Sequence, residues 1–203
     1  MIICTLHSEF NGIIAASFNT KAIDMRGSFK KIGLVGRNRQ RGLTGVLRQL
    51  LPLLQERQLN VVLQESLGDK LPDVDLPRAS LEEIGEQVDL VIVLGGDGSL
   101  LSAARTLARY SVPVLGINRG RLGFLTDITP DDIAQQIPRV LDGEYEEDSR
   151  FLLSAEVHRD GAVIGSGDAL NDVVVNSGSS AQMIEFELYI NDIFVYRQRA
   201  DGL

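Results

Sequence analysis

The stretch VIVLGGDGSLLSAARTLARY, residues 91–110, carries the strongest structural signal in this sequence. The apolar run VDLVIVL at residues 88–94 is typical of a parallel strand that is covered on both faces. Apolar residues then recur at helical spacing through residues 99–110, so a strand leads into a helix through the turn Gly95-Gly96-Asp97-Gly98. In open α/β sheets, ligands bind at the carboxyl ends of the strands, which is where this turn lies.

The turn has the composition of a phosphate-binding loop that also contains an acid. Glycines let a backbone approach phosphate oxygens closely, and the amides at the start of a helix attract anions. A carboxylate at Asp97 repels phosphate unless it serves a substrate hydroxyl as a base, or serves a metal ion. The alternative is a plain turn in which Asp97 or Ser99 caps the helix. The sequence matches neither GxGxxG nor GxxxxGK[ST], which disfavours two common nucleotide-binding motifs.

Residues on both sides of this stretch predict an α/β domain. Before it, a strand at residues 31–36, an apolar-striped helix at 43–54 and a strand at 60–64 form a βαβ unit. Ser80 and Glu83 have the spacing of a capping box, which predicts a short helix. After the turn, the sequence predicts a strand at residues 111–117 and a helix that begins after Thr129, runs to about Leu141 and ends at Gly143.

The pattern changes after the acidic stretch EYEED at residues 144–148. Beyond it the residues follow period 2, and the pairs Asp160-Gly161 and Asn191-Asp192 are typical of β-hairpin turns. Residues 1–29 show neither helical nor strand periodicity. We expect an unpatterned N-terminal extension at residues 1–29, a Rossmann-like α/β nucleotide-binding domain at 30–148, and at 149–203 the start of an all-β, sandwich-like domain.

The composition limits the partners that the protein can have. Twenty Lys and Arg against 28 Asp and Glu give a net charge of −8, which disfavours nucleic acid and a polybasic membrane surface. The single cysteine, Cys4, excludes an intramolecular disulfide and CxxC zinc or redox motifs. No apolar run is long enough to span a bilayer, and the N-terminus lacks the features of a signal peptide. We therefore expect a soluble, cytoplasmic protein, and His7 and His158 form no metal-binding pair.

Five segments, taken in order, resemble bacterial NAD kinases from about Lys31 to the end of the chain. This resemblance implies transfer of the ATP γ-phosphoryl group to the 2′-hydroxyl of the adenosine ribose of NAD, with Mg²⁺, in a homodimer or homotetramer. The segments are VIVLGGDGSLLSAARTLARY at residues 91–110, VPVLGINRGRLGFLTDI at 112–128, ALNDVVVNSG at 169–178, MIEFELYIND at 183–192 and QRADG at 198–202.

The resemblance also implies roles for individual residues. Asp97 matches the proposed base that deprotonates the ribose hydroxyl, and its glycine neighbours would line the same dinucleotide site. Phe124 would lie beside the NAD pocket. The nucleotide-binding residues implied by the resemblance are Gly95, Gly96, Asp97, Gly98, Phe124, Asn171, Asp172, Arg199 and Asp201.

Each of these assignments has a structural alternative. Asn171-Asp172 could simply begin a strand with a side-chain-to-backbone turn, and Asp201-Gly202 could be a plain turn. Phe124 could belong to the core, and Arg199 could be a solvated strand residue. A cluster of Arg37, Arg39 and Arg41 after the first strand could face a phosphate, or form a solvated loop.

Two departures from the family pattern affect what we expect. Gln182 stands where many bacterial members carry a basic residue or histidine. The resemblance therefore does not define the ligand contact at this position, which could determine the preference for NAD or NADH. Family members also continue beyond ADG into a further strand and a TPTGSTAY-like loop, whereas this chain stops at Leu203. We expect a truncated β domain with an unpaired edge, and the activity of the 203-residue chain alone is open.

Two other classes of function remain open at this point. Phosphofructokinase-like and lipid kinases share the GGDGS string, but the LGFLTD and Asn171-Asp172 segments argue against them. A non-catalytic dinucleotide-binding module is the second alternative. Formation of NADP from ATP, Mg²⁺ and NAD separates the three possibilities.

Overall fold

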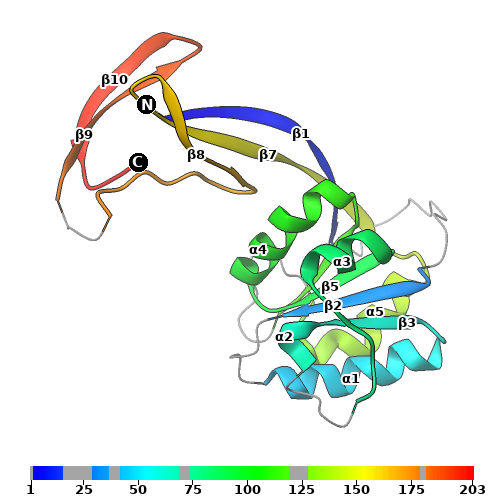
Figure 1. The fold of residues 1–203 in the computed structure, drawn as a ribbon. Helices are drawn as coiled ribbons and strands as arrows, with labels where there is room; N and C mark the ends of the chain where they lie inside the picture. The colour runs from blue at the N-terminus through cyan, green and yellow to red at the C-terminus, as the bar shows by residue number, and fades with distance from the viewer. Residues whose placement is uncertain (1, 16–28, 37–41, 69–73, 119–127, 179–181) are drawn as a thin grey trace.

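The protein folds into an α/β part and a β part that projects from it (Figure 1). The computed structural model describes residues 2–15, 29–36, 42–68, 74–118, 128–178 and 182–203, with side chains from residue 29 onward. Its eight-stranded sheet has the order β4-β3-β2-β5-β6-β1-β7-β8, and β10-β9 form a separate two-stranded sheet. The strands are β1 Ile2–Ala15, β2 Lys31–Gly36, β3 Asn60–Gln64, β4 Arg78–Ala79, β5 Leu90–Leu94, β6 Val114–Ile117, β7 Glu146–Arg159, β8 Ala162–Ala169, β9 Ile184–Ile190 and β10 Ile193–Ala200.

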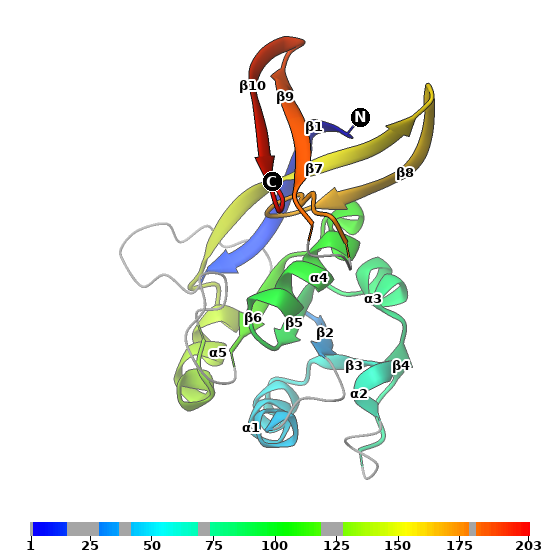
Figure 2. The same cartoon turned by 90° about the vertical axis from the view of Figure 1, so that its left-hand side faces the viewer.

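Helices cover both faces of the parallel strands (Figure 2). The described helices are α1 Leu43–Glu56, α2 Glu65–Gly68, α3 Leu81–Gln87, α4 Asp97–Leu107 and α5 Ile133–Leu141, with short 3₁₀ turns η1 Ala108–Tyr110 and η2 Pro130–Asp132. Strand β5 lies between β2 and β6 and is buried along its whole length. Its residues alternate between the core shared with α1 and α5 and the core shared with α3 and α4. This confirms the predicted strand that is covered on both faces.

Local sequence signals explain where the helices of the α/β part begin and end. The Ser80 hydroxyl accepts a hydrogen bond from the Glu83 backbone N–H at 3.2 Å, and the Glu83 carboxylate accepts one from the Ser80 N–H at 2.8 Å. The predicted capping box is therefore confirmed. Helix α5 follows the 3₁₀ turn that starts at Pro130, and Gly143 has φ of +89° just after its end, as expected for a glycine that stops a helix.

The β part contains strand β1 and two hairpins, β7-β8 and β9-β10, which have the predicted turns. Asp160 and Gly161 have φ of +51° and +80°, and Asn191 and Asp192 have φ of +50° and +63°, so both pairs form turns with two left-handed residues. No described residue from 142 to 203 is buried. Apolar side chains such as Ile193, which is 71% exposed, stand on the surface of this part.

The N-terminal segment differs from the sequence prediction. Residues 1–29 were expected to be unpatterned, but Ile2–Ala15 form strand β1, which pairs parallel with β6 and antiparallel with β7. The pairing with β7 shifts register between His7 and Glu9 and again between Asn11 and Ile13. Each shift leaves one extra residue in β1, which breaks the period-2 pattern by which a strand is recognised in a sequence. The predicted domain boundary between residues 148 and 149 falls within β7, and the division into domains stays a prediction.

Candidate functional site

The Gly95-Gly96-Asp97-Gly98 turn joins the carboxyl end of β5 to the start of α4. The Gly95 N–H donates to the carbonyl of Ile117 at 2.9 Å, which fixes the turn to the end of β6. Gly96 is the N-cap residue and Asp97 is the first residue of α4. The N-cap position of the helix is therefore Gly96 and not Asp97 or Ser99. Asp97 lies at the sheet edge where α/β folds bind ligands.

Two of these glycines have no described residue close to their Cα. A Cβ added to Gly96 or Gly98 would meet no atom of the described part of the chain within 4 Å, and neither residue has a positive φ. By contrast, a Cβ on Gly33 would lie 2.5 Å from Ile84, and one on Gly85 would lie 2.5 Å from the Tyr110 ring. Close packing thus explains Gly33 and Gly85, whereas neither packing against described residues nor backbone conformation explains Gly96 and Gly98. These two glycines lie at the N-terminal end of α4, where backbone amides and the helix dipole favour an anion.

A pocket of about 320 Å³ lies between α4 and the segment after β8. Leu101 and Arg105 line it and follow Asp97 by four and eight residues, so all three lie along one stripe of α4. The pocket therefore starts about one helical turn, or roughly 6 Å along the axis, from Asp97. Its lining residues are Leu101, Ser102, Arg105, Ala169, Leu170, Asn171 and Asp172.

Asn171 and Asp172 are exposed side chains on the far wall of this pocket. The Asn171 side-chain amide donates to the Asp172 carboxylate at 2.8 Å. Leu170 packs against the core shared with α3 and α4, which anchors the segment. The structure thus brings the predicted Asn171-Asp172 pair to the same helix that begins with Asp97.

Arg199 and Asp201 do not line this pocket. Arg199 is near the end of β10, opposite Glu185 of β9, and both Arg199 and Asp201 are exposed. The backbones of Val175 and Leu203 exchange two hydrogen bonds of 2.8 and 2.9 Å, and a Cβ on Gly202 would lie only 2.6 Å from the Val175 carbonyl oxygen. The end of the QRADG segment is therefore attached just beyond the pocket wall.

Other residues singled out in the sequence have different outcomes. Phe124 and the cluster of Arg37, Arg39 and Arg41 lie outside the described residues. Gln182 is exposed two residues before the start of β9. The sequence prediction also missed three polar residues. Ser102 and Arg105 line the pocket but have no local signal that separates them from an ordinary polar helix surface. Asn118, only 5% exposed, could have been found by its place directly after the buried strand β6.

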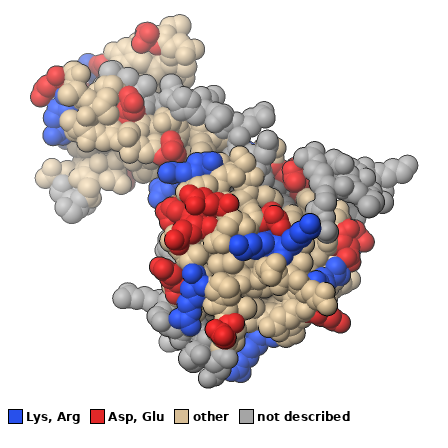
Figure 3. Space-filling view, turned by 45° about the vertical axis from the view of Figure 1, so that its right-hand side comes forward, with Lys and Arg blue, Asp and Glu red and all other residues tan. Residues whose placement is uncertain are grey.

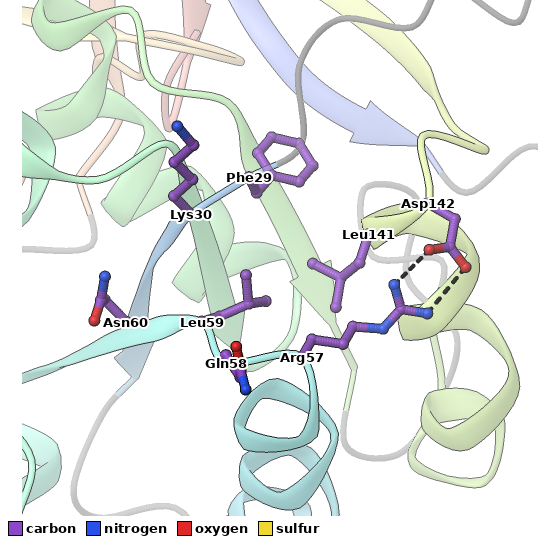
Figure 4. A pocket seen from close by; sticks show the side chains of 8 residues that line it. All are labelled: Phe29, Lys30, Arg57, Gln58, Leu59, Asn60, Leu141 and Asp142. Carbon is purple, nitrogen blue, oxygen red and sulfur yellow. Dashed lines mark hydrogen bonds and ion pairs between the residues drawn. The ribbon is translucent and has the colours of Figure 1, made fainter.

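A larger pocket of about 470 Å³ lies at the opposite edge of the parallel sheet, where β2 and β3 begin (Figure 4). Across it, the Arg57 guanidinium makes two hydrogen bonds to the Asp142 carboxylate, one of them 2.9 Å long. These bonds lower the pKa of Asp142 and raise that of Arg57. None of the predicted site residues lines this pocket, and it lies away from the carboxyl ends of the strands. We do not assign the candidate site to it.

The described surface of the α/β part carries charges of both signs (Figure 3). On the face shown in Figure 3, acidic and basic side chains alternate over the α/β part, without a wide basic patch among the described residues. In the part of the chain that the structure describes, no helix has the length and apolar character needed to cross a membrane. Within the same part, no three His, Cys, Asp or Glu side chains are grouped so that they could hold a metal ion.

Comparisons with known proteins agree on one family. Residues 32–145 match the model of the ATP-NAD kinase N-terminal domain. The NAD kinase of Pseudomonas fluorescens is 54% identical over 175 residues, which cover 86% of this chain and 59% of that protein. The NAD kinase of Alcanivorax borkumensis is also 54% identical, over 86% of this chain and 58% of its own length. This chain thus spans about three fifths of the relatives that it matches.

A solved structure supports the fold. The crystal structure of yeast NADH kinase complexed with NADH matches with a TM-score of 0.73 at 19% sequence identity. The match covers 87% of this chain and 57% of the yeast chain. A parallel sheet with helices, followed by antiparallel strands, is therefore an arrangement shared with a known structure, as the sequence predicted.

Proposed function

This chain belongs to the ATP-NAD kinase family, and we propose that the protein containing it phosphorylates the 2′-hydroxyl of the adenosine ribose of NAD with ATP. The observation that carries this proposal is the placement of Asp97 at the start of α4, one helical turn from a pocket walled by Asn171 and Asp172. A carboxylate, open anion-binding amides and a pocket for a hydroxyl-rich ligand together fit phosphoryl transfer to an alcohol.

Asp97 is the proposed base. Its carboxylate takes the proton of the ribose 2′-hydroxyl as that oxygen attacks the γ-phosphorus, and the bond from phosphorus to the β,γ-bridging oxygen breaks. The products are NADP and ADP. Phosphoryl transfer needs little covalent catalysis by the protein, so most of the rate increase comes from holding the hydroxyl in line with the γ-phosphate. The open amides beside Gly96 and Gly98 are proposed to hold phosphate oxygens.

Mg²⁺ is proposed to arrive with ATP. In such sites the ion takes most of its oxygens from phosphates and water and only one or two from carboxylates. The exposed Asp172 carboxylate at the pocket could supply one such oxygen, so the site fits the ion in this role and Asp97 stays available as the base. When bound, Mg²⁺ would neutralise charge on the transferring phosphates.

The remaining site residues have proposed binding roles. The Asp172 carboxylate, oriented by Asn171, can accept hydrogen bonds from ribose hydroxyls, and the unused donor of the Asn171 amide can bind a second polar group of NAD. Phe124, Arg199 and Asp201 are proposed NAD or ATP contacts through their match to the family motifs.

The assay for this proposal uses the complete protein, ATP, Mg²⁺ and NAD. We expect NADP to form in step with ADP. Fructose 6-phosphate and diacylglycerol serve as matched alternative acceptors, because GGDG-type kinases of other families use such alcohols. Phosphorylation of one of these, but not of NAD, would contradict the proposal. Binding of NAD without turnover would identify a dinucleotide-binding module instead.

We also propose that the protein acts in the cytoplasm as a homodimer or homotetramer. The absence of buried residues among the described positions 142–203, together with the exposed Ile193 and Phe194, supports an association surface in the β part. Light scattering coupled to gel filtration tests the assembly, and a monomer at all concentrations would contradict it.

A further inference from the structure

We propose that Arg105, assisted by Ser102, binds the diphosphate bridge of the dinucleotide, as a specificity-determining part of the site. This inference rests on the proposed function, because it assigns the pocket beside Asp97 to NAD. It adds a group from the last turn of α4 to a site otherwise built from the start of that helix and the segment after β8.

Arg105 occupies the right stripe of the helix. It lies eight residues after Asp97, which places their Cα atoms about 12 Å apart along the axis. Long side chains on a helix lean toward its N-terminus, so the guanidinium approaches Asp97 more closely than its Cα does. A dinucleotide with its ribose hydroxyl at Asp97 can therefore extend along α4 toward Arg105.

The charge of the pocket favours such a group. Arg105 is the cation among the lining residues, opposite the carboxylate of Asp172. The protein carries a net charge of −8, so a diphosphate needs a local positive charge to remain bound. Guanidinium groups match phosphate oxygens with two parallel hydrogen bonds.

The donors of Arg105 are available to a ligand. Its side chain is exposed at the pocket, and it makes no hydrogen bond or ion pair with a described residue. The neighbouring Asp172 carboxylate instead accepts its hydrogen bond from Asn171. The Ser102 hydroxyl, half-buried on the same wall, adds a further donor.

A structural role for Arg105 gives a different expectation. It lies in the last turn of α4, where a positive charge stabilises the helix dipole. That role would lower stability in a variant without changing its selectivity for phosphate-containing ligands. Arg109 offers a matched control, because it is an exposed arginine one turn later and does not line the pocket.

The test measures dissociation constants of NAD and adenosine by calorimetry in the complete protein, for wild type, Arg105→Gln, Arg105→Lys and Arg109→Gln. Since a charge-assisted hydrogen bond contributes about 1.5–3 kcal/mol, Arg105→Gln should weaken NAD binding about tenfold or more. Adenosine, which lacks the diphosphate, should bind wild type and variant equally. Arg105→Lys should lie between the two, and Arg109→Gln should match wild type.

Two results would overturn the inference. Equal NAD affinity in wild type and Arg105→Gln would remove Arg105 from the site, and an equal loss for adenosine and NAD would show a general structural effect. Turnover separates this outcome from failure of the proposed function. If the wild-type protein makes NADP and the Arg105→Gln variant has the same KM for NAD, only the inference about Arg105 is contradicted. If the wild-type protein neither binds nor phosphorylates NAD, both the inference and the proposed function are contradicted.

Discussion

The side-chain amide of Asn171 donates a hydrogen bond of 2.8 Å to the carboxylate of Asp172, on the wall of the pocket that faces α4. Both side chains are exposed, so water competes for these groups when the site is empty. The bond nevertheless sets the direction of the carboxylate before a ligand arrives. A pre-oriented acceptor loses less conformational entropy on binding a ribose hydroxyl.

Replacement of Asn171 by alanine should weaken NAD binding. The change removes the donor that orients Asp172 and one direct donor to the ligand, so we expect the dissociation constant for NAD to rise about tenfold. Calorimetry of the complete protein measures this constant. Asn60→Ala is the control, since Asn60 is exposed at the opposite edge of the sheet, and an equal loss in both variants would argue against a local effect.

Two helical glycines should respond in opposite ways to alanine. No described residue lies within 4 Å of a Cβ added at Gly98, so Gly98→Ala should keep or raise the melting temperature while raising the KM for NAD or ATP. Gly85 faces the Tyr110 ring, so Gly85→Ala should destabilise the protein by about 1–3 kcal/mol through overpacking. Thermal unfolding and steady-state kinetics give both quantities. Unchanged KM values for NAD and ATP in Gly98→Ala would show that neither substrate binds against Gly98.

The ion pair between Arg57 and Asp142 should stabilise the folded protein at neutral pH but not at strongly acidic pH. Its hydrogen bonds lower the pKa of Asp142 below the ordinary value of 3.8, so the folded state favours the ionised carboxylate. The contribution is present at neutral pH and is lost as pH falls through the folded pKa. Because Asp142 is 55% exposed, we expect at most about 1 kcal/mol.

Urea unfolding of wild type and Asp142→Asn at pH 7 and near pH 3 measures this contribution. The stability difference between the two proteins should shrink at the lower pH and in 1 M salt, which screens exposed charges. A difference that stayed constant with pH would show that the carboxylate charge is not responsible.

Much of the fold could be predicted from local sequence signals. The apolar run of β5, the capping box at Ser80, and the two hairpin turns each depend on residues close in the sequence, and the structure confirms them. Strand β1 was not predicted, because its bulges hide the alternation and its partner β7 begins more than a hundred residues later. Pairing over such a distance leaves no local pattern.

The candidate site was only partly predictable for a similar reason. The GGDG turn and the Asn171-Asp172 pair were found as motifs, and the structure brings them to one helix. Ser102 and Arg105 have the composition of an ordinary polar helix surface, so only the position of the segment after β8 identifies them as pocket residues. The hydrogen bonds between Arg57 and Asp142 also could not be predicted, because the two residues are 85 positions apart in the sequence.

The most direct measurement of the central claim compares wild type with Asp97→Asn in the complete protein. Asparagine keeps the size of the side chain but cannot take the proton. We therefore expect NADP formation to fall by about 10² to 10⁴-fold, while the dissociation constant for NAD changes little. Equal turnover in the two proteins would contradict the assignment of Asp97 as the base.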